Sequence, residues 1–194
     1  MRPQHNTSIS PAEYLSMERL AETKSEYANG EIFAMAGASR EHNQIASNIV
    51  ANLSNQLLER PCSVYASDMK VSMASAKHYA YPDIVGVCGP QQFEDEHTDV
   101  LLNPSLIIEI LSDSTEAYDR GLKFFRYQRL PSLREYLLVA QKFCQVELYQ
   151  RQHDGRWAYA EFHSMDDIVS LDSIHCLLPL QAVYQKVALS ETLI

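Results

Sequence analysis

The run Leu106–Leu111 limits the possible folds of this chain more than any other segment. Five of its six residues are leucine or isoleucine, and the sixth is Glu109. A near-continuous apolar run of this length is typical of a central strand that other elements cover on both faces of a sheet. Helices must then pack on that sheet, so we expect an α/β fold.

Helical patterns occur in three segments. Ser10–Glu13 is a capping box with proline at the first helical position, which predicts a helix running to about residue 22. Apolar residues recur every four positions within Ser39–Pro61, so a long amphipathic helix is expected there. The segment Thr115–Arg129 is predicted to form a further helix.

Strand patterns account for most of the remaining chain. Asn29-Gly30 predicts a hairpin, because this pair supplies the positive φ values of a tight turn, and Asp154-Gly155 predicts another. Strands are also expected at Cys62–Ser67, Met69–Met73, Asp83–Cys88, Glu135–Ala140, Val146–Gln150 and Trp157–Phe162. The stretch Leu178–Val187 is compatible with a last short helix or strand. These elements predict a mixed sheet flanked by helices, with antiparallel hairpins at its ends, in a single domain of residues 1–194.

The net charge of the chain is −9 at pH 7. Phosphate binding draws its affinity from lysine and arginine, so this charge disfavours a protein that coats nucleic acid. It does not exclude a nuclease, because a metal site built from carboxylates is itself acidic and basic residues need only line one groove.

The cysteines Cys62, Cys88, Cys144 and Cys176 form no C-x-x-C pair and have no histidine at zinc-finger spacing. We expect most of them to be small core residues in a reducing compartment. The first dozen residues lack the apolar core of a secretory signal, and no 18 uncharged apolar residues run together. A soluble, cytoplasmic protein without a membrane partner is therefore expected.

Glu109 is the residue that most strongly suggests a functional site. An unpaired carboxylate within an apolar strand costs roughly several kcal/mol in desolvation, so something must compensate its charge. On its strand face it lies between Ile107 and Leu111, and a cation from a neighbouring element is the simplest partner. A strand end that reaches solvent, or a plain buried ion pair, would also explain it.

Two further residues could act with Glu109. Asp83 begins the preceding strand directly after proline, and Mg²⁺ prefers one or two protein carboxylates plus water, although this dipeptide is also common in turns. Lys123 lies four residues after Asp119, a spacing typical of an exposed salt bridge. Its ammonium could instead point at the carboxylate pair, where it would position an attacking water and stabilise transition-state charge.

Pro82-Asp83, then Glu109 in an apolar strand, then a lysine resembles the active-site signature of the PD-(D/E)XK nucleases. Within that superfamily the chain resembles the Uma family of restriction endonucleases over about residues 13–150. The matching segments are Lys24–Ile32, Tyr65–Val71, Tyr81–Val85, Asn103–Ser112, Ser114–Lys123 and Leu130–Tyr136. Leu111 departs from the superfamily pattern, because it stands two residues after Glu109, where the lysine is usual. In the Uma family the lysine has moved to the following helix, which matches Lys123.

The resemblance implies a restriction endonuclease-like fold and an endonuclease that hydrolyses DNA phosphodiester bonds with Mg²⁺ or Mn²⁺. Asp83 and Glu109 would hold the metal, and Lys123 would orient the water. Glu31 and His42 match further family positions and could extend the site. An exposed hairpin glutamate and a surface or capping histidine are the simpler explanations of those two residues.

A catalytically idle nuclease-fold module that binds nucleic acid or a protein partner is the alternative function. The acidic charge favours this module, whereas the intact Asp83, Glu109 and Lys123 favour the enzyme. A serine or cysteine hydrolase and a nucleotide cofactor lack any supporting motif.

Superfamily members that cut both DNA strands often dimerise, so a homodimer is expected. The predicted hairpin Val146–Phe162 would offer an edge for it. Glu26 and Asp68 are interpreted as structural residues.

Overall fold

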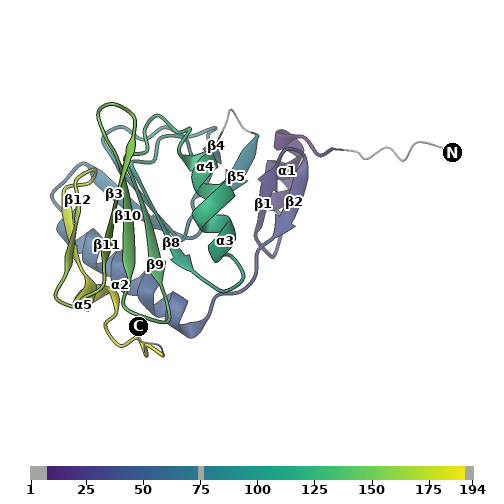
Figure 1. Cartoon of the computed structure of the whole chain (residues 1–194). Helices are drawn as coiled ribbons and strands as arrows, with labels where there is room; N and C mark the ends of the chain where they lie inside the picture. Colours follow the sequence, from purple (N-terminus) through teal and green to yellow (C-terminus); the bar gives the residue numbers. More distant parts are fainter. Residues whose placement is uncertain (1–7, 74–76, 191–194) are drawn as a thin grey trace.

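The computed structural model describes residues 8–73 and 77–190 (Figure 1). Its six-stranded sheet has the order β11-β10-β9-β8-β6-β3. The strands are β3 (Cys62–Ala66), β6 (Ile84–Cys88), β8 (Leu106–Leu111), β9 (Glu135–Ala140), β10 (Val146–Arg151) and β11 (Trp157–Phe162). Only the pair β8–β9 is parallel within this sheet, so the sheet is mixed, as the sequence predicts.

Strand β8 lies inside this sheet, and all six of its residues are buried. Leu106, Ile108 and Ile110 pack in one cluster with helix α2 (Arg40–Gln56). Because side chains alternate along a strand, Glu109 lies on the opposite face. That face is covered by the helical segment that follows β8 in the chain (Figure 1).

A second sheet lies beside the first and has the order β2-β1-β5-β4-β7 (Figure 1). Its strands are β1 (Ser25–Ala28), β2 (Glu31–Ala34), β4 (Lys70–Met73), β5 (His78–Ala80) and β7 (Val100–Leu101). The predicted hairpin turn is present, with φ of 49° at Asn29 and 96° at Gly30. The short strands β5 and β7 were not predicted, because three and two residues carry too little pattern.

Both strongly signalled helices form as expected. Helix α1 (Pro11–Glu18) has the complete capping box, in which the Ser10 hydroxyl accepts from the Glu13 backbone N–H and the Glu13 carboxylate accepts from the Ser10 N–H. It ends before residue 22, where the sequence placed its end. Helix α2 begins after Ser39, whose hydroxyl accepts a hydrogen bond from the His42 N–H. The first turn of α2 therefore holds His42 in a fixed position.

The helix predicted over residues 115–129 is broken into three pieces. These are α3 (Glu116–Tyr118), the π-helical turn η1 (Asp119–Lys123) and α4 (Phe124–Tyr127). Single π-turns inside helices occur frequently at functional sites. Here the turn buries both of its terminal residues, Asp119 and Lys123, against the sheet.

The end of the chain forms a small antiparallel pair, β12 (Ile168–Leu171) and β13 (Cys176–Pro179), followed by α5 (Leu180–Val183). The stretch Leu178–Val187 therefore contains both a strand end and a short helix. Among the described residues, no helix has the length and apolar character needed to cross a membrane.

The expectation of reduced core thiols is wrong for one pair of cysteines. Cys62 on β3 and Cys88 on β6 are register partners and form a disulfide, with their Cα atoms 4.0 Å apart. Cys144 and Cys176 are free, and Cys176 is buried in the core. Spacing along the sequence could not reveal the pair, because only the antiparallel register of β3 and β6 places the two cysteines opposite each other.

Candidate active site

Lys123 compensates the charge of Glu109. Its Nζ lies 2.9 Å from Glu109 Oε1, and both side chains are almost fully buried, with 6% and 3% of their surface exposed. The lysine reaches the strand from η1, which packs on the face that Glu109 shares with Ile107 and Leu111. The structure therefore brings these two predicted residues together.

Two more carboxylates contact the same ammonium. Lys123 Nζ lies 3.3 Å from Glu26 Oε1 and 3.6 Å from Asp119 Oδ1. The spacing of Asp119 and Lys123 thus gives a buried contact rather than an exposed salt bridge. Tyr127 also faces this group, and its hydroxyl lies 3.4 Å from Glu109 Oε1.

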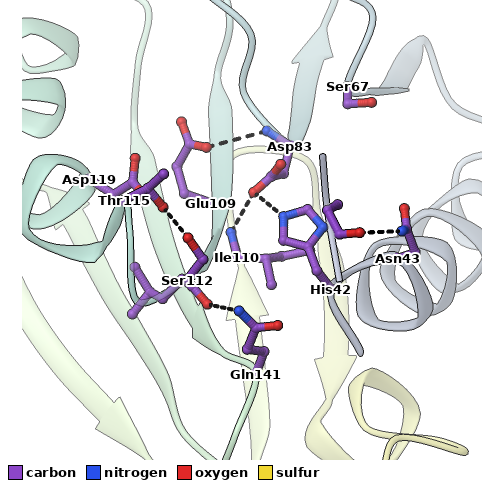
Figure 2. Close-up of polar contacts among 12 residues, drawn as sticks. His42, Asn43, Ser67, Asp83, Glu109, Ile110, Ser112, Thr115, Asp119 and Gln141 are labelled. Atoms are coloured by element: carbon purple, nitrogen blue, oxygen red, sulfur yellow. Dashed lines mark hydrogen bonds and ion pairs between the residues drawn. The ribbon is translucent and has the colours of Figure 1, made fainter. Parts of the chain in front are cut away.

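Asp83 adjoins Glu109 at the start of β6. Its Oδ2 accepts a hydrogen bond of 2.7 Å from the Ile110 N–H, and its own N–H lies 3.4 Å from Glu109 Oε2 (Figure 2). The antiparallel register of β6 and β8 creates this arrangement, since it pairs Ile84 with Ile108. Two acidic residues that are 26 residues apart in sequence consequently lie next to each other on neighbouring strands in the interior of the sheet.

His42 reaches Asp83 from the first turn of α2. Its Nε2 lies 3.1 Å from Asp83 Oδ2, as Figure 2 shows. Its Nδ1 is buried and has no hydrogen-bond partner among the described residues. The predicted histidine is thus adjacent to one carboxylate of the pair, and it can hold that carboxylate in place.

Of the two glutamates in the β1–β2 hairpin, the structure places Glu26 at the site, whereas the sequence suggested Glu31. Glu31 is exposed on the outer strand β2, and within the described part of the chain no hydrogen bond or ion pair joins it to the other site residues. Glu26, interpreted from the sequence as structural, contacts Lys123 from β1. Asp68 is mostly exposed and pairs with Lys24 outside the site, which agrees with a structural role.

Glu26 and Asp119 are the residues that sequence reasoning did not place at the site. Glu26 carried a weak signal, since it precedes the buried Tyr27 on a short strand. Asp119 was recognised as a helical neighbour of Lys123, but its burial depends on the π-turn, which no sequence pattern announced.

The cluster of Glu26, Asp83, Glu109, Asp119 and Lys123 contains more negative than positive charge. Burial raises the pKa of Glu109 well above its ordinary value, and the nearby Asp119 and Asp83 raise it further while Lys123 opposes them. Burial alone would lower the pKa of Lys123, but Glu109, Glu26 and Asp119 outweigh it and raise that pKa, so the ammonium stays protonated. A further cation at the carboxylates would relieve this imbalance.

The donor set fits a hard divalent cation with few protein ligands. Among the described residues, no three His, Cys, Asp or Glu side chains are arranged to hold a metal ion. These residues therefore do not form an all-protein cage such as a structural zinc site needs. Mg²⁺ and similar ions need only one or two carboxylates, because they keep several water molecules. Asp83 and Glu109, which are in contact, would supply such a pair of oxygen ligands.

Removal of the Glu109 charge gives a first prediction, for metal-free protein. Burial raises the pKa of Glu109 in the folded protein. The contribution of this carboxyl group to the free energy of unfolding is therefore complete below pH 4.5, where the group is protonated, and is lost as the pH rises through the raised pKa. Glu109→Gln should therefore leave the free energy of unfolding at pH 8 unchanged or raise it by up to about 2 kcal/mol. Urea unfolding in the presence of a chelator measures this.

A matched control is Glu147→Gln. Glu147 is as buried as Glu109, but its main partner is the guanidinium of Arg120, 2.6 Å away. This control should lower the free energy of unfolding by about 1–3 kcal/mol. A comparable loss for Glu109→Gln would show that Glu109 serves mainly as an ion-pair partner.

A mixed sheet flanked by helices, with two carboxylates and a lysine gathered at its interior strands, is typical of the restriction endonuclease-like fold class. The chain is similar, at a TM-score of 0.74 and 20% identity, to the crystal structure of "a putative nuclease belonging to DUF820" from Anabaena variabilis, over 93% of this chain and 99% of that one. Residues 11–181 match the Uma2 family, described as "Putative restriction endonuclease". The chain belongs to this family, and the predicted fold class is confirmed.

Two relatives come from the cyanobacterium Synechocystis sp. One uncharacterised protein is 34% identical over 180 residues, which are 93% of each chain. Another uncharacterised protein is 38% identical over 153 residues, 79% of this chain and 86% of the relative. The matched lengths show that the likeness extends over nearly the whole chain.

Proposed function

We propose that this protein is a metal-dependent endonuclease that hydrolyses phosphodiester bonds of DNA with Mg²⁺ or Mn²⁺. The observation that carries the proposal is the burial of Glu109 between Lys123, 2.9 Å away, and the backbone N–H of Asp83. A core built only for stability has little reason to gather several carboxylates around one lysine. Membership of a family described as "Putative restriction endonuclease" supports the same chemistry.

Each side chain has a role in this proposal. Asp83 and Glu109 hold the ion, which when bound supplies positive charge to the phosphate and a water of lowered pKa. Lys123 remains protonated, so it acts as a hydrogen-bond donor to the attacking water and the phosphate, not as a general base. His42 is a positioning residue for Asp83.

Glu26 and Asp119 act on the lysine in this proposal, not on the metal. Their contacts of 3.3 and 3.6 Å with Nζ fix the position of the ammonium. A lysine held by three acceptors loses little entropy when it binds a phosphate, which is the advantage of preorganisation.

A nicking assay tests the proposal. Supercoiled plasmid is incubated with purified protein at low salt, with Mg²⁺, with Mn²⁺ or with chelator. Metal-dependent conversion to open-circle or linear DNA is expected. Protein that binds Mn²⁺ in calorimetry but cuts no duplex, single strand or RNA would instead be the idle nuclease-fold module, which the net charge of −9 favours.

We further propose that the protein acts as a homodimer in which each chain contributes one nuclease domain. Strand β11 is the outer strand of the six-stranded sheet, and four of its six residues are exposed, so it presents a free edge. A dimer would supply two active sites, so that both strands of a duplex can be cut in one encounter. The molar mass in solution, from light scattering, decides between monomer and dimer.

A further inference from the structure

Three cations on one side of the candidate active site carry no compensating carboxylate. Some cations elsewhere are paired with a carboxylate, as in Arg156 with Asp154 and Lys24 with Asp68. Lys77, Arg126 and Arg129 form no ion pair with any residue in the ranges 8–73 and 77–190. Several other cations are also without an ion pair among these residues, but these three lie close enough together to act on one side chain, His78.

The three cations belong to two neighbouring elements. Lys77 immediately precedes β5, Arg126 lies on α4, and Arg129 follows α4. The helical segment α3–α4 runs beside β5 (Figure 1). His78 on β5 is buried near all three positive charges. Burial and these cations lower the pKa of its imidazole to about 4.

The group also adjoins the candidate active site. Arg126 Nη1 donates a hydrogen bond of 2.9 Å to the Tyr118 hydroxyl, which lies 3.5 Å from Glu26 Oε2. Glu26 in turn contacts Lys123. Tyr118 and Glu26 therefore connect the guanidinium of Arg126 to the ammonium of Lys123 through direct contacts.

An exposed aromatic ring accompanies the cations. Phe125 is 53% exposed, and the guanidinium of Arg129 lies over its ring, 4.6 Å from the centroid. An arginine stacked on an aromatic ring is held flat with its donors free for an anion. A ring of this kind is also a platform on which a base can stack.

We propose that Lys77, Arg126 and Arg129, with Phe125, form the surface that binds the phosphate backbone of a nucleic-acid substrate beside the active site. The inference rests on the proposed nuclease function. The net negative charge of the protein repels a polyanion, so a strand that enters the active site is favoured where uncompensated cations lie beside that site. Uncompensated lysines and arginines gain most from phosphate contacts, because they have no salt bridge to break.

The test uses the double variant Lys77→Gln/Arg129→Gln, since both residues are exposed and the fold should tolerate the change. Binding of a fluorescein-labelled DNA duplex is followed by anisotropy in chelator, at several salt concentrations. The double variant should bind at least about 10-fold more weakly at low salt, and the slope of log K against log[salt] should fall by about 2. The affinity for Mn²⁺, from calorimetry, should not change.

Arg156→Gln is the control, because it removes a positive charge that is also exposed but that Asp154 already compensates. It should leave affinity and salt slope as in the wild type. If wild-type protein binds and cuts DNA but the double variant binds with the same affinity and slope, the surface is elsewhere and only this inference fails. If wild-type protein binds no nucleic acid at low salt, the inference and the proposed function fail together.

Discussion

Replacement of Asp83 by asparagine is expected to abolish both divalent-ion binding and DNA cleavage. The amide oxygen of asparagine can still accept the hydrogen bond that the Ile110 N–H gives to Asp83, so the local fold is retained. The negative charge is lost, however, and one remaining carboxylate binds a hard cation weakly. Calorimetry with Mn²⁺ should show no binding, and the nicking assay should show at least a 1000-fold loss, on the order expected when a catalytic metal is lost.

Asp68→Asn is the matched control for that experiment. It removes the same charge from an exposed side chain outside the site, where Asp68 pairs with Lys24. Its ion binding and cleavage should equal those of the wild type. Retention of tight Mn²⁺ binding by Asp83→Asn would show that the ion is held by other residues.

Lys123→Met is expected to give the opposite combination of effects. Methionine fills most of the space of the lysine stem without its charge, so ion affinity should stay the same or increase slightly as a competing cation disappears. Cleavage should fall by about 100-fold or more, the typical cost of a lost electrostatic catalyst. The two variants therefore separate ion binding from the chemical step.

The same variant should also show how strongly the buried charges depend on the lysine. Glu109, Glu26 and Asp119 lose their common partner, so metal-free Lys123→Met should be destabilised by about 3–5 kcal/mol. Added Mn²⁺ should restore much of the melting temperature, because an ion that binds only folded protein stabilises it. A variant as stable as wild type in chelator would show that these carboxylates take up protons instead.

Much of the fold could be predicted because its signals are local. The capping box at Ser10, the turn at Asn29-Gly30 and the apolar repeat of α2 each act within a few residues, and all three form as expected. The apolar run of β8 likewise predicted a strand buried on both faces. The two-residue strand β7 and the disulfide between Cys62 and Cys88 were not predicted, because both depend on which strands become neighbours.

The candidate site was predictable only in part. Glu109 was conspicuous because a carboxylate in an apolar strand needs a partner, and a family resemblance pointed to Asp83, His42 and Lys123. The resemblance favoured Glu31 over Glu26, and the local pattern gave no reason to prefer Glu26, since both residues flank the same turn. The inner strand β1 faces the cluster, whereas the outer strand β2 is exposed, and the order of strands in a sheet is a long-range property.

The sequence by itself determined that a charged group would be buried in a central strand at Glu109 and that the chain would build helices and hairpins around it. Which groups contact the Glu109 carboxylate was decided only by the tertiary structure. The π-turn directs Lys123 and Asp119 inward, and the register of β6 with β8 brings Asp83 beside Glu109. The physical reason is that local patterns fix which face of an element is apolar, while contacts between distant charges exist only after strands have paired and helices have packed.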